Sequence, residues 1–449
     1  MDQRFNWRLP RILRRWILRS RPGVVLLAGY GLYMLLGWAL LALPIASDNG
    51  LAPMDSLFLA VSAVSTTGLV TVDPGSSLTP LGEGMLLVLF QVGGLGYLTI
   101  GSFAMLAIND RLGPVRTRVT RFAFSMPRDA RVAPFIRTVV LFALTCETLG
   151  TLSLWPLFAL EGVEAPFWKA LFHAVSAFCT AGFSLFPDSL EGFRGSLGVN
   201  LVISALSLAG AMGFLVAWDG WLRLTQPGYR IGFTTRVILG ATALMIVVGT
   251  VLTGFADAGL AKLPFAERWL AASFQAMSAA TTVGFNSYPI GALSLAPLLG
   301  LIVLMSIGAS PSGTGGGLKT TTVASMIGII RSVTHQRPDV RFLGRRIPDR
   351  RASMAAASCG YFAVMLAIAL GLLALSDAQL GFDALVFEAV SAVGTVGLST
   401  GVTAELSSTG KIVVMILMTA GRVGILAFAI ATALPERNSA TYEDDELLL

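Results

Sequence analysis

Long apolar stretches alternate along this chain with shorter segments of small and polar residues. A membrane-spanning helix needs about 20 mostly apolar residues, and the long stretches, the first of which starts near Val24, reach that length. The short segments, of about ten residues, cover half a bilayer, which is typical of re-entrant segments that enter and return. The pattern predicts eight full crossings, with a re-entrant segment between the members of each pair.

The short segments are copies of one motif, Val/Met-Ser-Ala-x-x-Thr-x-Gly-Leu/Phe. They read AVSAVSTTGLVTVD (60–73), AVSAFCTAGFSLFP (174–187), AMSAATTVGFNSYP (276–289) and AVSAVGTVGLSTGV (389–402). The motif recurs about once per quarter of the chain, which indicates four copies of one unit. We therefore expect an all-α polytopic membrane protein with four parallel repeats of helix, re-entrant pore helix and helix around a pseudo-fourfold central pore.

The repeats divide the chain into six parts. These are a basic cytoplasmic N-terminus (1–23), repeat 1 (24–131), repeat 2 (132–231), repeat 3 (232–350) with an intramembrane loop (308–320), repeat 4 (351–434) and a cytoplasmic tail (435–449).

Each short segment ends in Thr-x-Gly, and non-helical backbone at membrane depth is tolerated where it is buried or lines a water-filled cavity. Four such strands around one axis would form rings of backbone carbonyls, which is how potassium pores replace the hydration shell of the ion. The alternative is close-packing chemistry in a transporter, and four copies at one period favour the filter. The candidate ion-binding residues, which would hold K⁺ through backbone carbonyls, are Thr66, Thr67, Gly68, Thr180, Ala181, Gly182, Thr282, Val283, Gly284, Thr395, Val396 and Gly397.

The second long helices carry a weaker repeat, G-x-x-G, at GGLGYL (93–98), GAMGFL (210–215) and GRVGIL (421–426). In repeat 3 the equivalent place, starting at Gly313, is the glycine-rich stretch SPSGTGGGLKTTT (310–322). Such a run is a poor helix former, so we expect the helix to break there and the other three to stay compact. It is not a Walker A loop, because Leu318 precedes Lys319.

The loop is a candidate gate below the filter. A buried charge inside a membrane helix is a functional candidate by default, and the loop carbonyls are the natural partners of such a residue in the last helix. Lys319 could plug the pore, contact a partner or extend to the cytoplasmic surface. The candidate gate residues are Ser312, Gly313, Thr314, Gly315, Gly316, Gly317, Lys319 and Arg422.

Composition and charge agree with a membrane protein. Hydrophobic residues make up 54% of the chain and charged residues 13%, against roughly 25% charged in soluble domains. Arginines cluster before the first helix, at 111–137, at 223–236 and at 331–351, while the loops between are acidic. The positive-inside rule makes the basic loops and both termini cytoplasmic. Three scattered cysteines and two histidines predict neither a disulfide framework nor a metal centre.

Four further residues have candidate roles. Asn286 is expected at the outer pore mouth, and Glu147 as a protonated or hydrogen-bonded packing residue away from the axis. His173 and Glu388 occupy one position of the motif in repeats 2 and 4. We expect both to start a pore helix, with capping or packing roles.

The single-glycine segments, SPSGTGGGLKTTT and Arg422 together resemble the Trk/Ktr/HKT superfamily of potassium and sodium transporters over nearly the whole chain. The resemblance is greatest to KtrB, the membrane subunit of bacterial Ktr systems. The first repeat follows directly on the basic tail, whereas TrkH members usually carry two extra N-terminal helices. Plant-type HKT proteins often have Ser where this chain has Gly68.

The resemblance implies K⁺ as the transported ion, Na⁺ as a stimulant, no covalent cofactor, and a bacterial inner-membrane location. It further implies a homodimer with one pore per protomer, on a cytosolic ring of KtrA-like nucleotide-binding regulatory subunits. Membrane lipid is the other expected partner, and nucleic acid is not one. One departure is that the strands lack the T-V-G-Y-G of potassium channels, so looser discrimination against sodium is expected.

Two alternative functions make different predictions for the sequence. An intramembrane hydrolase would need a nucleophile and a base inside the membrane, and no Ser/His or paired Asp arrangement is evident. A sodium-coupled or less selective K⁺/Na⁺ secondary transporter of the same superfamily, TrkH-like, is the stronger alternative. A secondary transporter would predict inverted repeats, whereas these four are parallel.

Overall fold

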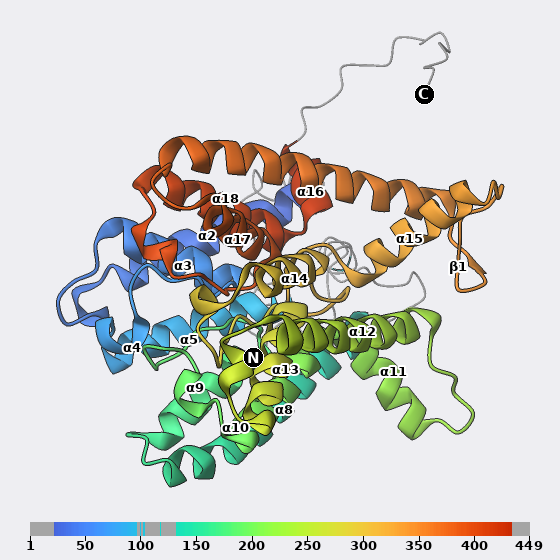
Figure 1. Cartoon of the computed structure of the whole chain (residues 1–449). Coiled ribbons are helices and arrows are strands. Elements are labelled where there is room, and N and C mark those ends of the chain that lie inside the picture. Colours follow the sequence, from blue (N-terminus) through green and yellow to red (C-terminus); the bar gives the residue numbers. More distant parts are fainter. Residues whose placement is uncertain (1–21, 97–98, 100–101, 104–116, 118–131, 433–449) are drawn as a thin grey trace, which may run out of the picture.

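The computed structural model describes residues 22–96, 99, 102–103, 117 and 132–432 (Figure 1). Both termini and most of the basic loop at 111–137 lie outside these residues. The predictions made for the N-terminus, for the C-terminal tail and for most of that loop therefore concern residues that the structure does not describe. Within the described part all regular secondary structure is helical apart from one short hairpin, which confirms the all-α class.

The first helix and the pore helix of each repeat are uninterrupted. The first helices are α2 (Pro22–Leu41), α8 (Val132–Leu160), α12 (Phe233–Ala256) and α16 (Asp349–Ser376). The pore helices are α3 (Pro53–Ser65), α9 (Pro166–Phe178), α13 (Phe265–Thr281) and α17 (Phe382–Gly394). The pore helices have 13 to 17 residues, longer than the expected ten but still too short to span.

The second helices are α5 (Pro80–Leu95), α10 (Leu197–Ala211), α14 (Leu295–Ile307) and α18 (Ser408–Val423). In repeats 2, 3 and 4, where the residues after the second helix are described, a further helix follows: α11 (Phe214–Thr225), α15 (Thr320–Thr334) and α19 (Ile425–Thr432). Short elements complete the outer loops: η1 (Pro44–Ala46), α4 (Pro74–Ser77), η2 (Glu191–Phe193), η3 (Leu260–Lys262), η4 (Ile290–Ala292) and η5 (Val402–Glu405). Strands β1 (Arg341–Phe342) and β2 (Arg345–Arg346) form the hairpin between α15 and α16.

The four repeats pack in chain order around one centre. Within each repeat the pore helix packs on the first and second helices, and the second helix also packs on the pore helix of the next repeat. These contacts join α5 to α9, α10 to α13 and α14 to α17, and α18 to α3 closes the circle. In Figure 1 the four colour ranges gather accordingly around a common middle. The arrangement is the pseudo-fourfold one expected from the motif.

The pore helices are buried, whereas the first helices expose leucine and valine outward, for example Leu141, Leu149 and Leu244. Such exposure carries no hydrophobic cost when lipid tails are the solvent. Among the described residues four helices are long and apolar enough to cross a membrane, or six when each bent pair counts as one span. The expected eight exceeds this number because the second helices are short or interrupted.

Each of the four second helices is followed within two residues by a glycine with positive φ, a conformation that other residues resist. These are Gly96 (φ 82), Gly213 (φ 88), Gly308 (φ 58) and Gly424 (φ 96). The chain bends by 95° between α10 and α11 and by 108° between α18 and α19. The expectation that three second helices stay compact was therefore wrong. The helix of repeat 3 breaks at Gly308, the first residue of the loop expected at 308–320.

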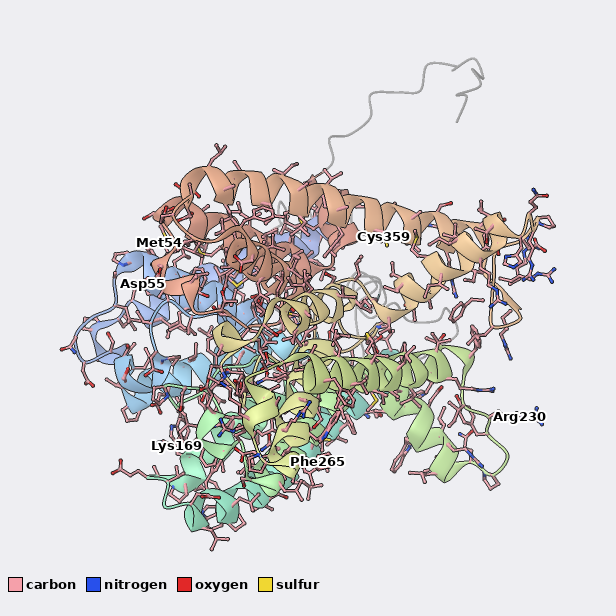
Figure 2. The ribbon with its side chains drawn as sticks, viewed as in Figure 1. Met54, Asp55, Lys169, Arg230, Phe265 and Cys359 are labelled. Carbon is pink, nitrogen blue, oxygen red and sulfur yellow. The ribbon has the colours of Figure 1, made fainter. Side chains whose placement is uncertain are left out.

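Different parts of the chain lie at the two ends of the molecule. Figure 2 shows Asp55 and Lys169, in the first turns of pore helices α3 and α9, toward one end. Arg230, in the loop between α11 and α12, lies at the opposite end, as does the arginine-rich hairpin. Pore helices α3 and α9 therefore start from one end of the molecule, and the loop that contains Arg230 and the arginine-rich hairpin lie at the other.

Candidate functional site

Each candidate filter strand has one repeated backbone shape. The threonine after the pore helix is left-handed in all four copies, with φ of 52° (Thr66), 49° (Thr180), 59° (Thr282) and 48° (Thr395). The glycine two residues later also has positive φ, from 68° at Gly182 to 95° at Gly397. A left-handed threonine costs about 1–2 kcal/mol, so the surrounding contacts must hold it there.

The serine of the motif supplies one such contact. Its carbonyl oxygen accepts the backbone N–H of the residue before the glycine in all four repeats, for example Thr67 to Ser62 at 2.9 Å. In repeats 1 and 4 its hydroxyl also accepts the glycine N–H, at 3.1 Å for Gly68 and for Gly397. These amides bond back to the pore helix, so the strand carbonyls stay available. No role for this serine was predicted, although its presence in all four copies was a signal.

The four strands meet in a closed ring. A Cβ on Gly68 would meet the carbonyl oxygen of Ala181 in the next repeat, and a Cβ on Gly182 would meet that of Val283. Gly284 stands likewise against Val396. A Cβ on Gly397 would meet the carbonyl oxygen of Thr67 in repeat 1, and this contact closes the ring. Glycine is required at these positions because the backbones touch, and the structure brings all twelve candidate filter residues together.

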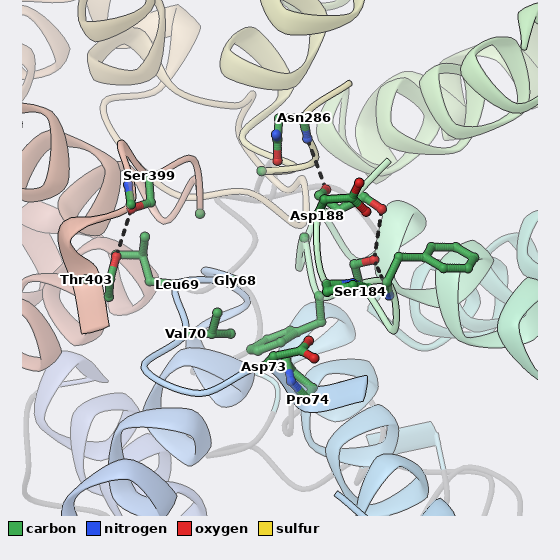
Figure 3. A pocket seen from close by; sticks show the side chains of 18 of the residues that line it. Gly68, Leu69, Val70, Asp73, Pro74, Ser184, Asp188, Asn286, Ser399 and Thr403 are labelled. Atoms are coloured by element: carbon green, nitrogen blue, oxygen red, sulfur yellow. Dashed lines mark hydrogen bonds between the residues drawn. The ribbon is translucent and has the colours of Figure 1, made fainter. Parts of the chain in front are cut away.

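A cavity of about 330 Å³ opens above this ring, toward the end where the pore helices start (Figure 3). It is lined by all four filter glycines and by acidic side chains from repeats 1 and 2, Asp73, Asp188 and Glu191. Acidic groups of this kind attract cations to a pore entrance. The cavity therefore has the shape and charge of an outer vestibule.

Asn286 lines this vestibule, and its side-chain amide donates to Glu191 Oε1 at 2.7 Å. Its backbone oxygen accepts from Leu190 at 3.0 Å. Partial burial raises the pKa of Glu191 and Asp188 adds to the rise, while Asn286 and Arg194 oppose it. Asn286 therefore joins the repeat 3 strand to the outer loop of repeat 2.

His173 and Glu388 lie in the middle of α9 and α17, not at the start as expected, because each pore helix begins about two turns earlier. His173 Nε2 lies 3.0 Å from Ser184 Oγ, two residues after the filter glycine. Ser399, at the same place in repeat 4, donates to Glu388, which also accepts from Thr403 at 2.9 Å. Both side chains hold the outer strand in place.

The intramembrane loop, residues 308–319, lies directly below the ring. Thr180 Oγ1 donates to Thr314 Oγ1 at 3.0 Å. A Cβ on Gly315 would meet Thr282 Oγ1, and one on Gly316 would meet Thr395 Oγ1. Three consecutive loop residues thus contact the signature threonines of repeats 2, 3 and 4. Only glycine leaves room for this approach.

Lys319 holds the loop from its far end. Its ammonium donates to the carbonyl oxygens of Gly315 at 2.7 Å and Gly316 at 3.3 Å. The lysine therefore folds back onto its own loop, a contact that was not predicted. Carbonyls that the break leaves without helical partners thereby gain a charged donor.

Arg422 reaches the loop from repeat 4. One guanidinium nitrogen donates to the Thr314 carbonyl and, at 3.0 Å, to Thr66 Oγ1. The other donates to the carbonyls of Gly93 and, at 2.8 Å, Gly94, at the end of α5. The arginine therefore bonds both to the loop, as expected, and to a second helix end that the sequence did not indicate.

Glu147 is buried and bonded, as a packing residue would be. Gln91 on α5 donates to both of its carboxyl oxygens at 2.9 Å. The Cys179 thiol, next to Thr180 of the filter, donates to Gln91 Oε1 at 3.0 Å. The cluster links the second helix of repeat 1 to the filter strand of repeat 2. Gln91 went unnoticed because a single polar residue in an apolar helix carries no periodic signal.

Comparisons with known proteins agree with this geometry. A profile of the TrkH family, described as cation transport protein, matches residues 39–442. The chain is 35% identical to Ktr system potassium uptake protein B of Vibrio alginolyticus, over 96% of this chain and 95% of that protein. It is 32% identical to the potassium/sodium uptake protein NtpJ of Enterococcus hirae, over 91% and 92% of the two chains.

The crystal structure of the potassium transporter TrkH from Vibrio parahaemolyticus has the same fold. The TM-score is 0.72 at 17% sequence identity, and the match covers 92% of this chain and 86% of that one. Family members are transporters, not enzymes. Since the family profile and a relative at 35% identity both match over most of its length, this chain belongs to the TrkH family of cation transport proteins.

Proposed function

We propose that this protein takes up potassium ions across the cell membrane through a channel-like pore. The ring of filter strands is its selectivity filter, and the loop at 308–319 is its gate. Two relatives at 32–35% identity are named Ktr system potassium uptake protein B, from Vibrio alginolyticus and Bacillus subtilis. Potassium is accordingly the expected substrate of this chain.

The ring of glycines and carbonyls is the observation that carries the proposal. Four carbonyls, of Thr67, Ala181, Val283 and Val396, alternate with four glycines around one centre. Their amides are bonded back to the pore helices, so the oxygens are available to replace water around a cation. The pore helices end at the ring, and each C-terminal end adds roughly half a negative charge.

Replacing Gly284 or Gly68 by Ser should lower K⁺/Na⁺ discrimination, because the new Cβ displaces the carbonyl of the neighbouring strand. Competition of Na⁺ with ⁸⁶Rb⁺ uptake into proteoliposomes measures this. Gly192→Ser is the matched control, since Gly192 lies in the outer loop with open space around it. Unchanged selectivity in both filter variants would refute the filter.

The loop is proposed as the gate because it fills the space below the filter. Thr314, Gly315 and Gly316 contact the filter threonines, and Lys319 and Arg422 bind the loop carbonyls. In this arrangement the pore is shut. Opening requires the loop to move aside, a local order–disorder switch.

Deleting residues 312–317 should raise potassium flux and make it independent of any regulatory subunit. Arg422→Ala should act in the same direction by a smaller amount, because Lys319 still holds the loop. Rubidium influx per folded dimer in proteoliposomes measures both. A deletion protein that folds and conducts no faster than the parent would make the loop scaffolding.

We further propose a homodimer in the bacterial inner membrane, with both termini in the cytoplasm and a KtrA-like nucleotide-binding ring docked on its basic loops. Sodium would stimulate transport without being a covalent or resident cofactor. The relatives' name, Ktr system, supports an assembly of more than one component.

A less selective, sodium-coupled transporter is the second candidate. Each strand keeps a single glycine, so the filter has fewer carbonyl rings than T-V-G-Y-G would form, and one relative is named for both potassium and sodium uptake. Coupling would make K⁺ accumulation depend on a sodium gradient at fixed membrane potential. A channel-like pore would not show this dependence.

A further inference from the structure

The gate loop is docked on the broken second helix of repeat 2. The Ser310 amide donates to the Ala211 carbonyl at 3.1 Å, and the Thr314 amide donates to the Gly210 carbonyl at 3.2 Å. In the opposite direction the Phe214 amide donates to the Ser312 carbonyl at 3.2 Å. Three main-chain bonds therefore join the loop to the junction of α10 and α11.

This docking depends on the bend. In a continuous helix the carbonyls of Gly210 and Ala211 would accept from the amides four residues later, which begin at Phe214. The bend at Gly213 leaves these groups without helical partners, and the loop supplies the partners instead. The fit is close, since a Cβ on Gly213 would meet the Pro311 oxygen. Straightening the junction and docking the loop are thus mutually exclusive.

Helix α11 has few contacts that could hold this bend. Of its residues only Phe214 is buried. At its middle, however, the Asp219 carboxylate accepts from Tyr229 OH at 2.7 Å, from Thr235 Oγ1 at 2.6 Å and from the Gly232 amide at 3.0 Å. These partners belong to the start of α12 and the loop before it, and Figure 1 shows α11 slanting away from α12 to that loop. The bond raises the pKa of Tyr229 to about 12, so its hydroxyl remains a donor.

We propose that Asp219 is a positioning residue for the gate: it fixes α11 against the start of α12, keeps the α10–α11 junction bent, and so keeps the junction carbonyls available to the loop. This inference rests on the proposed gate. A signal that frees α11 on the cytoplasmic side would let the junction straighten and would release the loop without touching Arg422 or Lys319.

The test compares substitutions in the full-length protein and in the variant lacking residues 312–317. Asp219→Ala removes all three bonds, whereas Tyr229→Phe and Thr235→Val remove one each. The matched control is Arg223→Ala, an exposed position on the same helix. Rubidium influx should rise on the order of fivefold for Asp219→Ala and less for the two single-bond variants. It should not rise for Arg223→Ala.

In the loop-deleted protein the same substitutions should leave influx unchanged, because no loop remains to release. An equal change in both backgrounds would overturn the inference. So would no change in either background when the deletion alone raises influx. Tyr229→Phe keeps the carboxylate and carries the test if Asp219→Ala does not fold.

Hydrogen exchange separates this inference from the proposed gate. Faster exchange of the Ser310 and Thr314 amides in Asp219→Ala is expected, and unchanged exchange there would refute the positioning role. If exchange is faster but the deletion does not raise influx, Asp219 holds the loop and the loop is not the gate.

Discussion

At the scale of single residues, the motif serine shows how a side chain of the pore helix can position a strand of the candidate filter. Ser62 and Ser391 accept the amide of the filter glycine, whereas the hydroxyl of Ser278 has no partner among the described residues. The motif serine therefore positions the strand through its hydroxyl in repeats 1 and 4 but not in repeat 3. Ser278 can serve as the control for a substitution of Ser62.

Ser62→Ala should leave the buried Gly68 amide unpaired, at a cost of about 1–3 kcal/mol. We expect a lower thermal midpoint in detergent and weaker discrimination of K⁺ from Na⁺. Ser278→Ala removes a hydroxyl without a partner and should change neither quantity. Equal effects of the two substitutions would mean that the hydroxyl bond to glycine does not position the strand.

The sequence predicted those site residues that recur in every repeat or are unusual in their helix. It did not predict the contacts that occur in only one repeat. The filter glycines recur four times, and Arg422 is an unusual charge in an apolar helix. The bonds from Arg422 to Gly93 and Gly94, and from Gln91 to Glu147, join distant parts of the chain. A local pattern contains no information on such pairs.

At the scale of elements, the recurring feature is a second helix that ends at a glycine. The run of glycines in repeat 3 predicted one break. The G-x-x-G motifs of the other three repeats were interpreted as packing motifs within continuous helices. The structure shows that the second glycine of each motif is a helix end with positive φ. Gly at such a C-terminal position is common, and this signal was present in all three motifs.

Gly424→Ala tests whether the bend between α18 and α19 is rigid. The new Cβ would meet only one atom, 4.0 Å away, so the strain comes from φ of 96° alone. We expect a loss of about 1–2 kcal/mol in the free energy of unfolding. Gly371→Ala, in the straight helix α16 with open space around it, should not destabilise. A neutral Gly424→Ala, measured by thermal unfolding in detergent, would show a flexible bend.

At the scale of the whole molecule, the two ends differ in charge. The acidic vestibule lies at one end, and the arginines around the β1–β2 hairpin lie at the other. In the hairpin region Arg341 and Arg346 pair with Asp339. Parallel copies of one motif predict the circular order of the repeats. They do not predict which helices touch across repeats, because the apolar faces of the helices have similar sequences.

Reversing the charge of Arg337, Arg350 and Arg351, which are exposed around the hairpin, should abolish co-purification with a nucleotide-binding subunit. Lys262→Glu, at the opposite end, is the control and should leave the complex intact. The alternative is that these arginines bind anionic lipid, worth about 1 kcal/mol each. A charge-reversed protein that assembles normally but loses affinity for anionic vesicles would support lipid binding.

The closed ring has a genetic consequence, because one polypeptide supplies all four of its quarters. In a pore assembled from four identical chains, one mutation alters every quarter, and mixed expression produces hybrid pores. Here a mutation alters a single quarter, and a defective filter stays within the chain that carries it. Co-expressed alleles should therefore conduct as the sum of two pore populations, so a filter mutation that abolishes transport should be recessive. The sequence of each filter strand can also change in evolution without a change in the other three.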